Sequence, residues 1–263
     1  MVDAPELLEL ACEIAREAGA LAVRRRLEGV EVAATKSAVA DIVTAADREV
    51  EALIRRRLAE ARPGDGFLGE ESGAERGTTD ITWVVDPIDG TVNYAYGIPH
   101  FAVSIAAVAG EPVANEWMPL AGVVFDPSRD ELFSAARGGG AWVGGQRLAV
   151  SAPSAAGALL ATGFGYDPAT HEGDLARVRR VMPLARDLRR AGAASLDLAY
   201  VAAGRLDGYF ERGLHPWDDA AGGLLVTEAG GVLGGQPHDV PGRDMTIAAG
   251  AELFEQITRA VYR

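Results

Sequence analysis

The chain has 263 residues, which is enough for one large domain or for two halves packed against each other. Hydrophobic residues make up 48% and charged residues 24% of the sequence, a balance that excludes a chain disordered throughout. The formal net charge of −13 opposes binding to nucleic acids or anionic membranes, so we expect neither as a partner. It also requires any phosphate site to obtain positive charge locally, from metal ions or helix N-termini.

The cysteine count and the lengths of the apolar stretches indicate the cellular compartment of the protein. Cys12 is the only cysteine, so no intrachain disulfide can form and a reducing compartment is favoured. The first residues lack the basic start and apolar run of a signal peptide, and no apolar stretch is long enough to cross a bilayer. The sequence therefore predicts a cytoplasmic protein.

The first half of the chain is predicted to contain two amphipathic helices followed by a sheet. Apolar residues recur at helical spacing over residues 4–27 and 44–60. In the second helix, Thr44 followed three residues later by Asp47 has the pattern of a helix cap. Four runs typical of strands follow, separated by turns rich in Gly and Pro: 81–85, 101–108, 121–125 and 131–135. Successive hairpins of this kind favour a largely antiparallel sheet.

After about residue 150 strands and helices alternate, which indicates an α/β layer. The predicted strands are 158–162, 208–210 and 245–249, and the predicted helices are 171–183, 195–203, 218–229 and 251–262. No flexible linker is visible in the sequence. We therefore expect an N-terminal α+β half, residues 1–150, and a C-terminal α/β half, residues 151–263, packed as one unit.

The most informative segment is WVVDPIDGTVNY, residues 83–94. An apolar strand brings Asp86 to its end, and Pro87 favours a turn that places the Asp86 and Asp89 carboxylates on one side. Two such anions repel each other unless a cation lies between them, and oxygen ligands favour a hard cation such as Mg²⁺ over Zn²⁺. Gly90 and Thr91 can then begin a short helix whose N–H groups face an anion. Taken alone, the segment fits an ordinary solvated β-turn equally well.

Three further acids are candidates for the same site, although each has a structural explanation. Glu70 follows a short apolar run and could share the cation, but in isolation it is more typical of an exposed loop. Asp47 falls on the apolar face of its helix, where it either caps the helix, the favoured interpretation, or turns inward toward a hydroxyl or a water. Asp218 could complete a site for two cations, but acids are common at helix N-termini. The four histidines match no zinc spacing.

Together these segments resemble the inositol monophosphatase family. The shared motifs are Glu70-Glu71-Ser72, the strand-end sequence 86–94, the sequence WDDAAG at 217–222 and EAGG at 228–231. They occur in the family's order, and further similarity at 36–47 and 189–211 extends the resemblance over nearly the whole chain. The resemblance implies an α+β or α/β fold, a layered αβαβα sandwich of the inositol monophosphatase and fructose bisphosphatase type, and a homodimer.

The resemblance also implies a role for each site residue. The implied ligands of two or more Mg²⁺ ions are Glu70, Asp86, the Ile88 backbone carbonyl, Asp89 and Asp218. The residues implied to orient the attacking water are Thr91, Glu70 and Asp47. The implied phosphate-binding N–H groups are those of Gly90 and Thr91, and the implied substrate-facing residues are Gly192, Ala193, Ala194 and Glu211. Most metal ligands thus come from the N-terminal half and the substrate-binding residues from the C-terminal half.

The activity implied is Mg²⁺-dependent hydrolysis of the phosphate monoester of a small polyol, with myo-inositol monophosphate as the leading substrate and Li⁺ as an inhibitor. Phosphoryl transfer needs an in-line nucleophile and charge stabilisation, so we expect direct attack by water and no phosphoenzyme. Phosphatases of the haloacid dehalogenase type place a nucleophilic Asp two residues before its partner, whereas Asp86 and Asp89 are three residues apart. The spacing therefore argues against that class.

Two alternatives stay open. Related branches act on fructose 1,6-bisphosphate, histidinol phosphate or a 3′-phosphorylated adenine nucleotide, although Glu211 would repel a second phosphate. The other alternative is a binding or regulatory protein that kept the fold without turnover; such drift usually removes a metal ligand, and no ligand is missing. Asp219 and His100 depart from the family pattern, and the extra acid at 219 puts the charge balance beside Asp218 in question.

Overall fold

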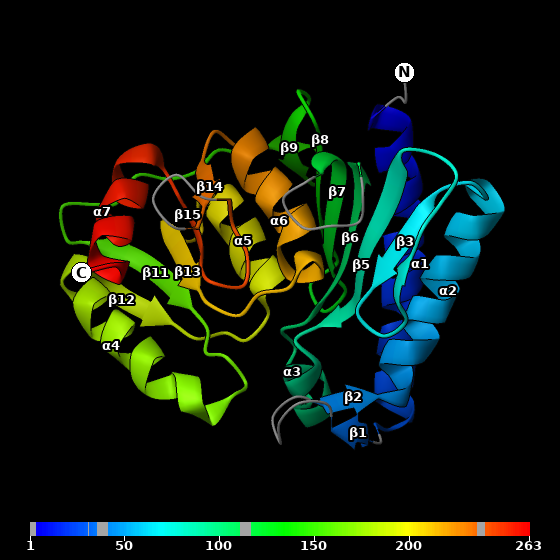
Figure 1. The fold of residues 1–263 in the computed structure, drawn as a ribbon, viewed down its shortest axis with the longest axis horizontal. Coiled ribbons are helices and arrows are strands. Elements are labelled where there is room, and N and C mark those ends of the chain that lie inside the picture. The colour runs from blue at the N-terminus through cyan, green and yellow to red at the C-terminus, as the bar shows by residue number, and fades with distance from the viewer. Residues whose placement is uncertain (1–3, 31, 36–41, 111–116, 236–239) are drawn as a thin grey trace.

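A computed structural model describes residues 4–30, 32–35, 42–110, 117–235 and 240–263. These residues form five layers in the order helix, sheet, helix, sheet, helix, seen from right to left in Figure 1. This layered sandwich confirms the predicted fold class. Part of the region of family similarity, residues 36–41, lies outside the described residues. None of the described helices is long and apolar enough to span a bilayer.

The first helical layer consists of α1 (Ala4–Glu28) and α2 (Ala45–Ala61), with a two-stranded sheet of β1 (Val32–Thr35) and β2 (Ile42–Thr44) beside it. Both helices pack on the first large sheet because their apolar residues recur every three or four positions and are buried. The predicted cap of α2 is confirmed: the Thr44 hydroxyl accepts from the Asp47 N–H, and the Asp47 carboxylate accepts from the Thr44 N–H at 2.8 Å.

The first large sheet has eight strands in the order β10-β9-β8-β7-β6-β5-β3-β4. Neighbours are antiparallel except β3 and β5, which are parallel, so the prediction of a largely antiparallel sheet is confirmed. The strands are β3 (Gly66–Gly69), β4 (Gly73–Glu75), β5 (Ile81–Asp89), β6 (Ala102–Ala109), β7 (Met118–Asp126), β8 (Glu131–Ala136), β9 (Gly140–Val143) and β10 (Gln146–Arg147).

Strand β5 corrects one prediction. We expected the strand to end at Asp86 and to turn at Pro87, but β5 continues to Asp89 and is followed directly by the short helix α3 (Thr91–Tyr96). Its pairing with β6 is irregular between Asp86 and Asp89, because Pro87 has no N–H to donate to the ladder. The irregularity therefore lies between the two acids, which are themselves paired with β6.

The second large sheet has five strands in the order β12-β11-β13-β15-β14. Strands β11, β12 and β13 are parallel, whereas β15 pairs antiparallel with β13 and β14. The outer helical layer is formed by α4 and α7. The bounds are β11 (Ala158–Thr162), η1 (Pro168–Thr170), α4 (His171–Val181), η2 (Met182–Leu184), β12 (Ala185–Arg189), β13 (Gly208–Glu211), β14 (Val232–Gly234), β15 (Thr246–Ala249) and α7 (Ala251–Val261).

The central layer, α5 (Ala194–Ala202) and α6 (Pro216–Glu228), lies between the two sheets and contacts both (Figure 1). Small residues make this possible: a Cβ on Gly122 of β7 would lie 3.0 Å from the Ala221 Cα, and one on Gly222 would lie 2.7 Å from the Leu198 Cβ. Helix α6 starts two residues before the prediction, since Pro216 fits the first turn of a helix. The start of α6 therefore lies against the first sheet, near the end of β5.

Candidate active site

Three aspartates from two distant parts of the chain meet where β5 ends and α6 begins. Carboxylate oxygens of Asp86, Asp89 and Asp218 all lie within 4.8 Å of one another. Asp86 and Asp89 come from β5, and Asp218 comes from the first turn of α6. The structure thus brings together the strand-end pair and the distal acid that the sequence motifs singled out.

Backbone donors fix the orientation of each aspartate. The Ile88 N–H donates to Asp86 Oδ1 at 3.0 Å, and the His215 N–H donates to Asp218 Oδ2 at 2.6 Å. Asp89 has the largest set of donors: Ser195 donates to its Oδ2 from both the N–H, at 2.7 Å, and the hydroxyl, at 2.5 Å. The carboxylates are therefore held in place by the protein itself, as a preorganised site requires.

The buried, mutually repelling carboxylates of this cluster favour a bound cation. Burial, followed by the charges of Glu70 and Asp89, raises the pKa of Asp86 well above its ordinary value. Burial and then the charge of Asp89 raise the pKa of Asp218 in the same way. Burial is the first cause of each shift, and repulsion among the carboxylates adds to it. A donor set made only of oxygen fits a hard dication such as Mg²⁺.

Glu70 lies beside the three aspartates. It follows β3, and its N–H donates to the Val85 carbonyl of the neighbouring strand at 3.2 Å. Its charge contributes to the raised pKa of Asp86, after burial, and to that of Asp218, after burial and Asp89. Glu70 is therefore close to the cluster rather than solvated in a separate loop, and its role as a ligand stays a prediction.

Thr91 connects the cluster to α2. Its Oγ1 lies 3.2 Å from Asp47 Oδ1 and 3.1 Å from the Ile88 carbonyl oxygen. The two interpretations of Asp47 are therefore both correct, because one carboxylate oxygen caps α2 while the other faces the Thr91 hydroxyl. Burial raises the pKa of Asp47 to about 6, despite its hydrogen bonds to Thr44.

Gly90 joins β5 to α3 in a conformation that needs glycine. Its φ is +90°, and a Cβ there would lie 3.2 Å from the Gly192 carbonyl oxygen and 3.2 Å from the Ala193 Cβ. The predicted phosphate-binding and substrate-facing positions are thus in contact. Asn93 fixes this contact, because its Nδ2 donates to the carbonyl oxygens of His100 and Ala191, each at 2.9 Å.

Glu211 is the predicted substrate-facing residue that lies outside the loop 191–194. It is the last residue of β13, and the Tyr209 hydroxyl donates to its Oε2 at 2.5 Å. Burial raises its pKa to about 7, although the Tyr209 hydrogen bond and the charge of Arg190 act in the opposite direction. At neutral pH a substantial fraction of Glu211 is ionised and able to accept hydrogen bonds.

Asp219 takes only a small part in the charge balance of the cluster. The Thr246 hydroxyl donates to its Oδ2 at 3.3 Å, and its side chain lines a cavity of about 440 Å³ together with apolar residues such as Leu224. Its charge raises the pKa of Asp218 less than burial, Asp89 and Glu70 do.

The sequence analysis did not single out Ser195, Asn93 or Tyr209. Asn93 stands inside the 86–94 motif, which is the signal that could have found it. Tyr209 alternates with Glu211 on β13, so period-two spacing places both side chains on one face. Ser195 has no sequence signal of its own, because its bond to Asp89 depends on how α5 packs against β5.

Comparisons with known proteins agree with this geometry. A family model described as the inositol monophosphatase family matches residues 3–263. Inositol-1-monophosphatase SuhB of Mycobacterium tuberculosis is 40% identical over 259 residues, covering 94% of this chain and 87% of the relative. Nus factor SuhB of Escherichia coli K12 is 44% identical over 230 residues, covering 86% and 84%. The crystal structure of extragenic suppressor protein suhB from Bartonella henselae has a TM-score of 0.89 and 38% identity, covering 98% and 99%. Family and fold support phosphatase activity on phosphate monoesters.

Proposed function

We propose, since this chain belongs to the inositol monophosphatase family, that it hydrolyses the phosphate monoester of a small polyol with Mg²⁺ as cofactor. Myo-inositol monophosphate is the leading substrate. The observation that supports the proposal most directly is the cluster of Asp86, Asp89 and Asp218, whose oxygens lie within 4.8 Å of one another. By resemblance to the family we also expect a homodimer and inhibition by Li⁺.

The residues proposed to hold Mg²⁺ are Glu70, Asp86, the Ile88 carbonyl oxygen, Asp89 and Asp218. When bound, the cation neutralises the carboxylates, lowers the pKa of a water in the pocket and stabilises charge on the leaving oxygen. The hydrogen bond from the Ile88 N–H to Asp86 Oδ1, at 3.0 Å, supports assigning Ile88 to the same site as Asp86. The cation thereby supplies the positive charge that a chain of net charge −13 otherwise lacks.

Thr91 and Asp47 are proposed to orient the attacking water. The Thr91 hydroxyl has one proton, which it donates to the carboxylate of Asp47 or to the Ile88 carbonyl. In either case a lone pair of Oγ1 stays available to accept a hydrogen bond from a water in the site. Glu70 provides a second acceptor, so the water is held with its oxygen lone pair directed at phosphorus.

The phosphate and the polyol are proposed to bind on opposite sides of the loop 191–194. The N–H groups of Gly90 and Thr91 face the phosphate, and Gly192, Ala193 and Ala194 line the path to the polyol. Glu211, held by Tyr209, accepts hydrogen bonds from the polyol hydroxyls. A neutral polyol is favoured because hydroxyl groups can satisfy a partly buried carboxylate.

The test is phosphate release from a panel of monoesters with and without Mg²⁺. The panel contains inositol 1-phosphate, fructose 1,6-bisphosphate, histidinol phosphate and a 3′-phosphorylated adenine nucleotide. We expect Mg²⁺-dependent release that is fastest from inositol 1-phosphate; a preference for the bisphosphate would overturn this ranking. Hydrolysis in ¹⁸O-labelled water should place one solvent oxygen in phosphate with inversion at phosphorus, whereas a trapped aspartyl-phosphate would contradict direct attack by water.

A non-catalytic binding protein is the second candidate function. The observation in its favour is that the Escherichia coli relative carries the name of a Nus factor. The aspartate cluster argues against it, since its three members remain close enough to share a cation. Absence of Mg²⁺-dependent release from every monoester in the panel would give this candidate the lead.

A further inference from the structure

Glu51 is a buried acid of α2 that has no part in the mechanism proposed above. Its side chain is 3% exposed and belongs to the buried face of the helix, together with Val50 and Ile54. An ionisable side chain is seldom buried so completely unless a partner in the protein uses it. The contacts of Glu51 therefore indicate what it does.

The partner of Glu51 is the loop that contains Glu70. Glu51 Oε2 accepts a hydrogen bond from the Glu71 N–H at 2.8 Å. The carboxylate also packs against the backbone just before the loop, since a Cβ on Gly69 would lie 2.6 Å from Glu51 Cδ. Glycine at position 69 thus leaves the space that the carboxylate occupies. Glu51 therefore contacts the residues on both sides of Glu70.

Packing contributes little to the outer side of this loop. Residues 70–72 connect β3 to β4, and β4 is the edge strand of the eight-stranded sheet, with all three of its residues exposed. On the inner side, the Glu70 N–H donates to the carbonyl of Val85, the residue before Asp86. The bond to Glu51 is thus a further anchor of the loop, and it fixes the backbone immediately after Glu70.

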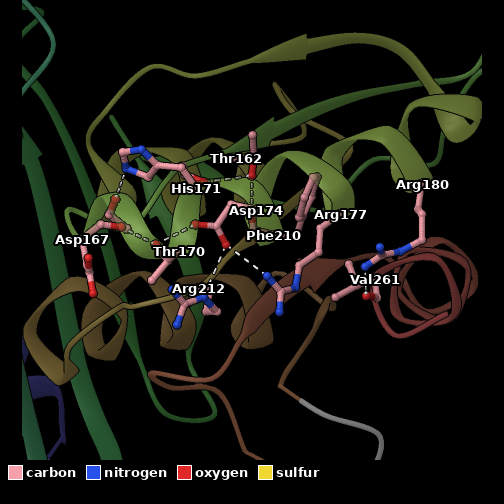
Figure 2. A network of polar contacts seen from close by, with 12 residues as sticks. Thr162, Asp167, Thr170, His171, Asp174, Arg177, Arg180, Phe210, Arg212 and Val261 are labelled. Atoms are coloured by element: carbon pink, nitrogen blue, oxygen red, sulfur yellow. Dashed lines mark hydrogen bonds and ion pairs between the residues drawn. The ribbon is translucent and has the colours of Figure 1, made fainter.

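A comparison with a second buried acid, Asp174, shows why the partner matters. Figure 2 shows Arg177 and Arg212 converging on Asp174, whose Oδ1 accepts from Arg177 Nη1 at 3.1 Å and from Arg212 Nε at 3.3 Å. Two cations therefore account for the burial of Asp174. Glu51 instead accepts from a backbone N–H next to a proposed metal ligand, and groups in that position orient the ligand.

We propose that Glu51 is a positioning residue whose carboxylate holds the loop 70–72, so that Glu70 stays beside Asp86. The inference rests on the proposed function, in which Glu70 is a Mg²⁺ ligand, and adds the group that sets the position of this ligand. Glu51 acts through the backbone of Glu71. A carboxylate suits this task, because a charged acceptor forms a stronger hydrogen bond than a neutral one.

The experiment compares wild type with Glu51→Ala, which removes the acceptor, and Glu51→Gln, which keeps an acceptor oxygen. The control is Leu53→Ala, which truncates another buried residue of α2. We expect Glu51→Ala to raise the Mg²⁺ concentration for half-maximal phosphate release about tenfold or more, and to change KM for inositol 1-phosphate less than about threefold. Glu51→Gln should change the Mg²⁺ dependence less than about threefold. Leu53→Ala should lower the melting temperature and leave the Mg²⁺ dependence unchanged.

Hydrogen exchange at the Glu71 amide measures the proposed bond without any activity. Exchange should be at least about threefold faster in Glu51→Ala than in wild type, and less affected in Leu53→Ala. If Glu51→Ala does not fold, Glu51→Asp replaces it, because its carboxylate is one methylene short of the Glu71 N–H. Unchanged exchange at this amide would overturn the inference.

The Mg²⁺ dependence gives two further outcomes against the inference: no change in a folded Glu51→Ala, or the same change in Leu53→Ala. Failure of the proposed function is distinguishable, because then wild type releases phosphate from no monoester. In that case calorimetric titration with Mg²⁺ decides the inference. Glu51→Ala must bind Mg²⁺ about tenfold more weakly than wild type, and equal binding, or no binding by either protein, refutes it.

Discussion

Position 163 offers a direct test of the contact between Glu211 and the polyol. A Cβ on Gly163 would lie 2.0 Å from both carboxylate oxygens of Glu211, whereas ordinary van der Waals contact begins near 3.4 Å. The substitution Gly163→Ala must therefore displace the carboxylate by about 1.4 Å. A displacement of that size directly away from the Tyr209 hydroxyl would lengthen their hydrogen bond from 2.5 Å to about 3.9 Å, beyond hydrogen-bonding range.

We expect Gly163→Ala to lower kcat/KM for inositol 1-phosphate about tenfold to hundredfold, since a hydrogen bond to a charged group contributes about 1.5–3 kcal/mol. An aryl phosphate without polyol hydroxyls should lose less than about threefold, because it does not use Glu211. The matched control is Gly165→Ala, whose Cβ would meet a movable atom, Thr170 Oγ1, at 3.0 Å. Equal losses on both substrates, or no loss on inositol 1-phosphate, would refute this reasoning.

Four further predictions concern the metal and the pH dependence. Asp86→Asn should lower activity at least about a hundredfold at fixed Mg²⁺, because a neutral amide replaces an anionic ligand, and a Mg²⁺ titration should show the weaker binding. Mg²⁺ at a hundred times its Kd should raise the free energy of unfolding by about 2.7 kcal/mol, and calorimetry that finds no change would contradict a metal site. The pKa of Glu211, raised to about 7, predicts that KM for the polyol falls as pH rises through 7, since the ionised carboxylate accepts stronger hydrogen bonds than the neutral acid. Glu211→Gln should remove this pH dependence of KM while leaving that of the aryl phosphate in place. The same raised pKa means that the contribution of Glu211 to folding stability declines as pH rises through 7.

Apolar strands could be predicted from the sequence, whereas a polar strand could not. Residues 158–162 form a strand with the predicted bounds, because a run of apolar residues fits a buried strand. Strand β12, Ala185–Arg189, was missed because its charged residues interrupt the apolar run that identifies a buried strand. Strand β5 was predicted too short, because pairing with β6 overrides the tendency of Pro87 to end a strand.

Some residues of the candidate site could likewise be predicted from the sequence, and others could not. Asp86 and Asp89 are neighbours in sequence, so local geometry alone suggested that they act together. No local rule connects them to Asp218, and only the resemblance to a family placed it in the same site. Ser195 bonds to Asp89 because α5 packs against β5, and such a contact leaves no trace in spacing or composition. Sequence reasoning therefore found the acids and missed the groups that hold or balance them.

The position of the acids between the two sheets links metal binding to packing. Asp86 belongs to the first sheet and Asp218 to α6, which packs on that sheet through contacts as close as Ala221 against Gly122. Burial and mutual repulsion raise the pKa of both acids, so without a cation the approach of α6 to β5 is electrostatically opposed. A bound dication reverses the sign of that interaction. The close contacts of small residues in α6 therefore do more than fill the core, because they hold the acids close together, where the proposed cation would offset their repulsion.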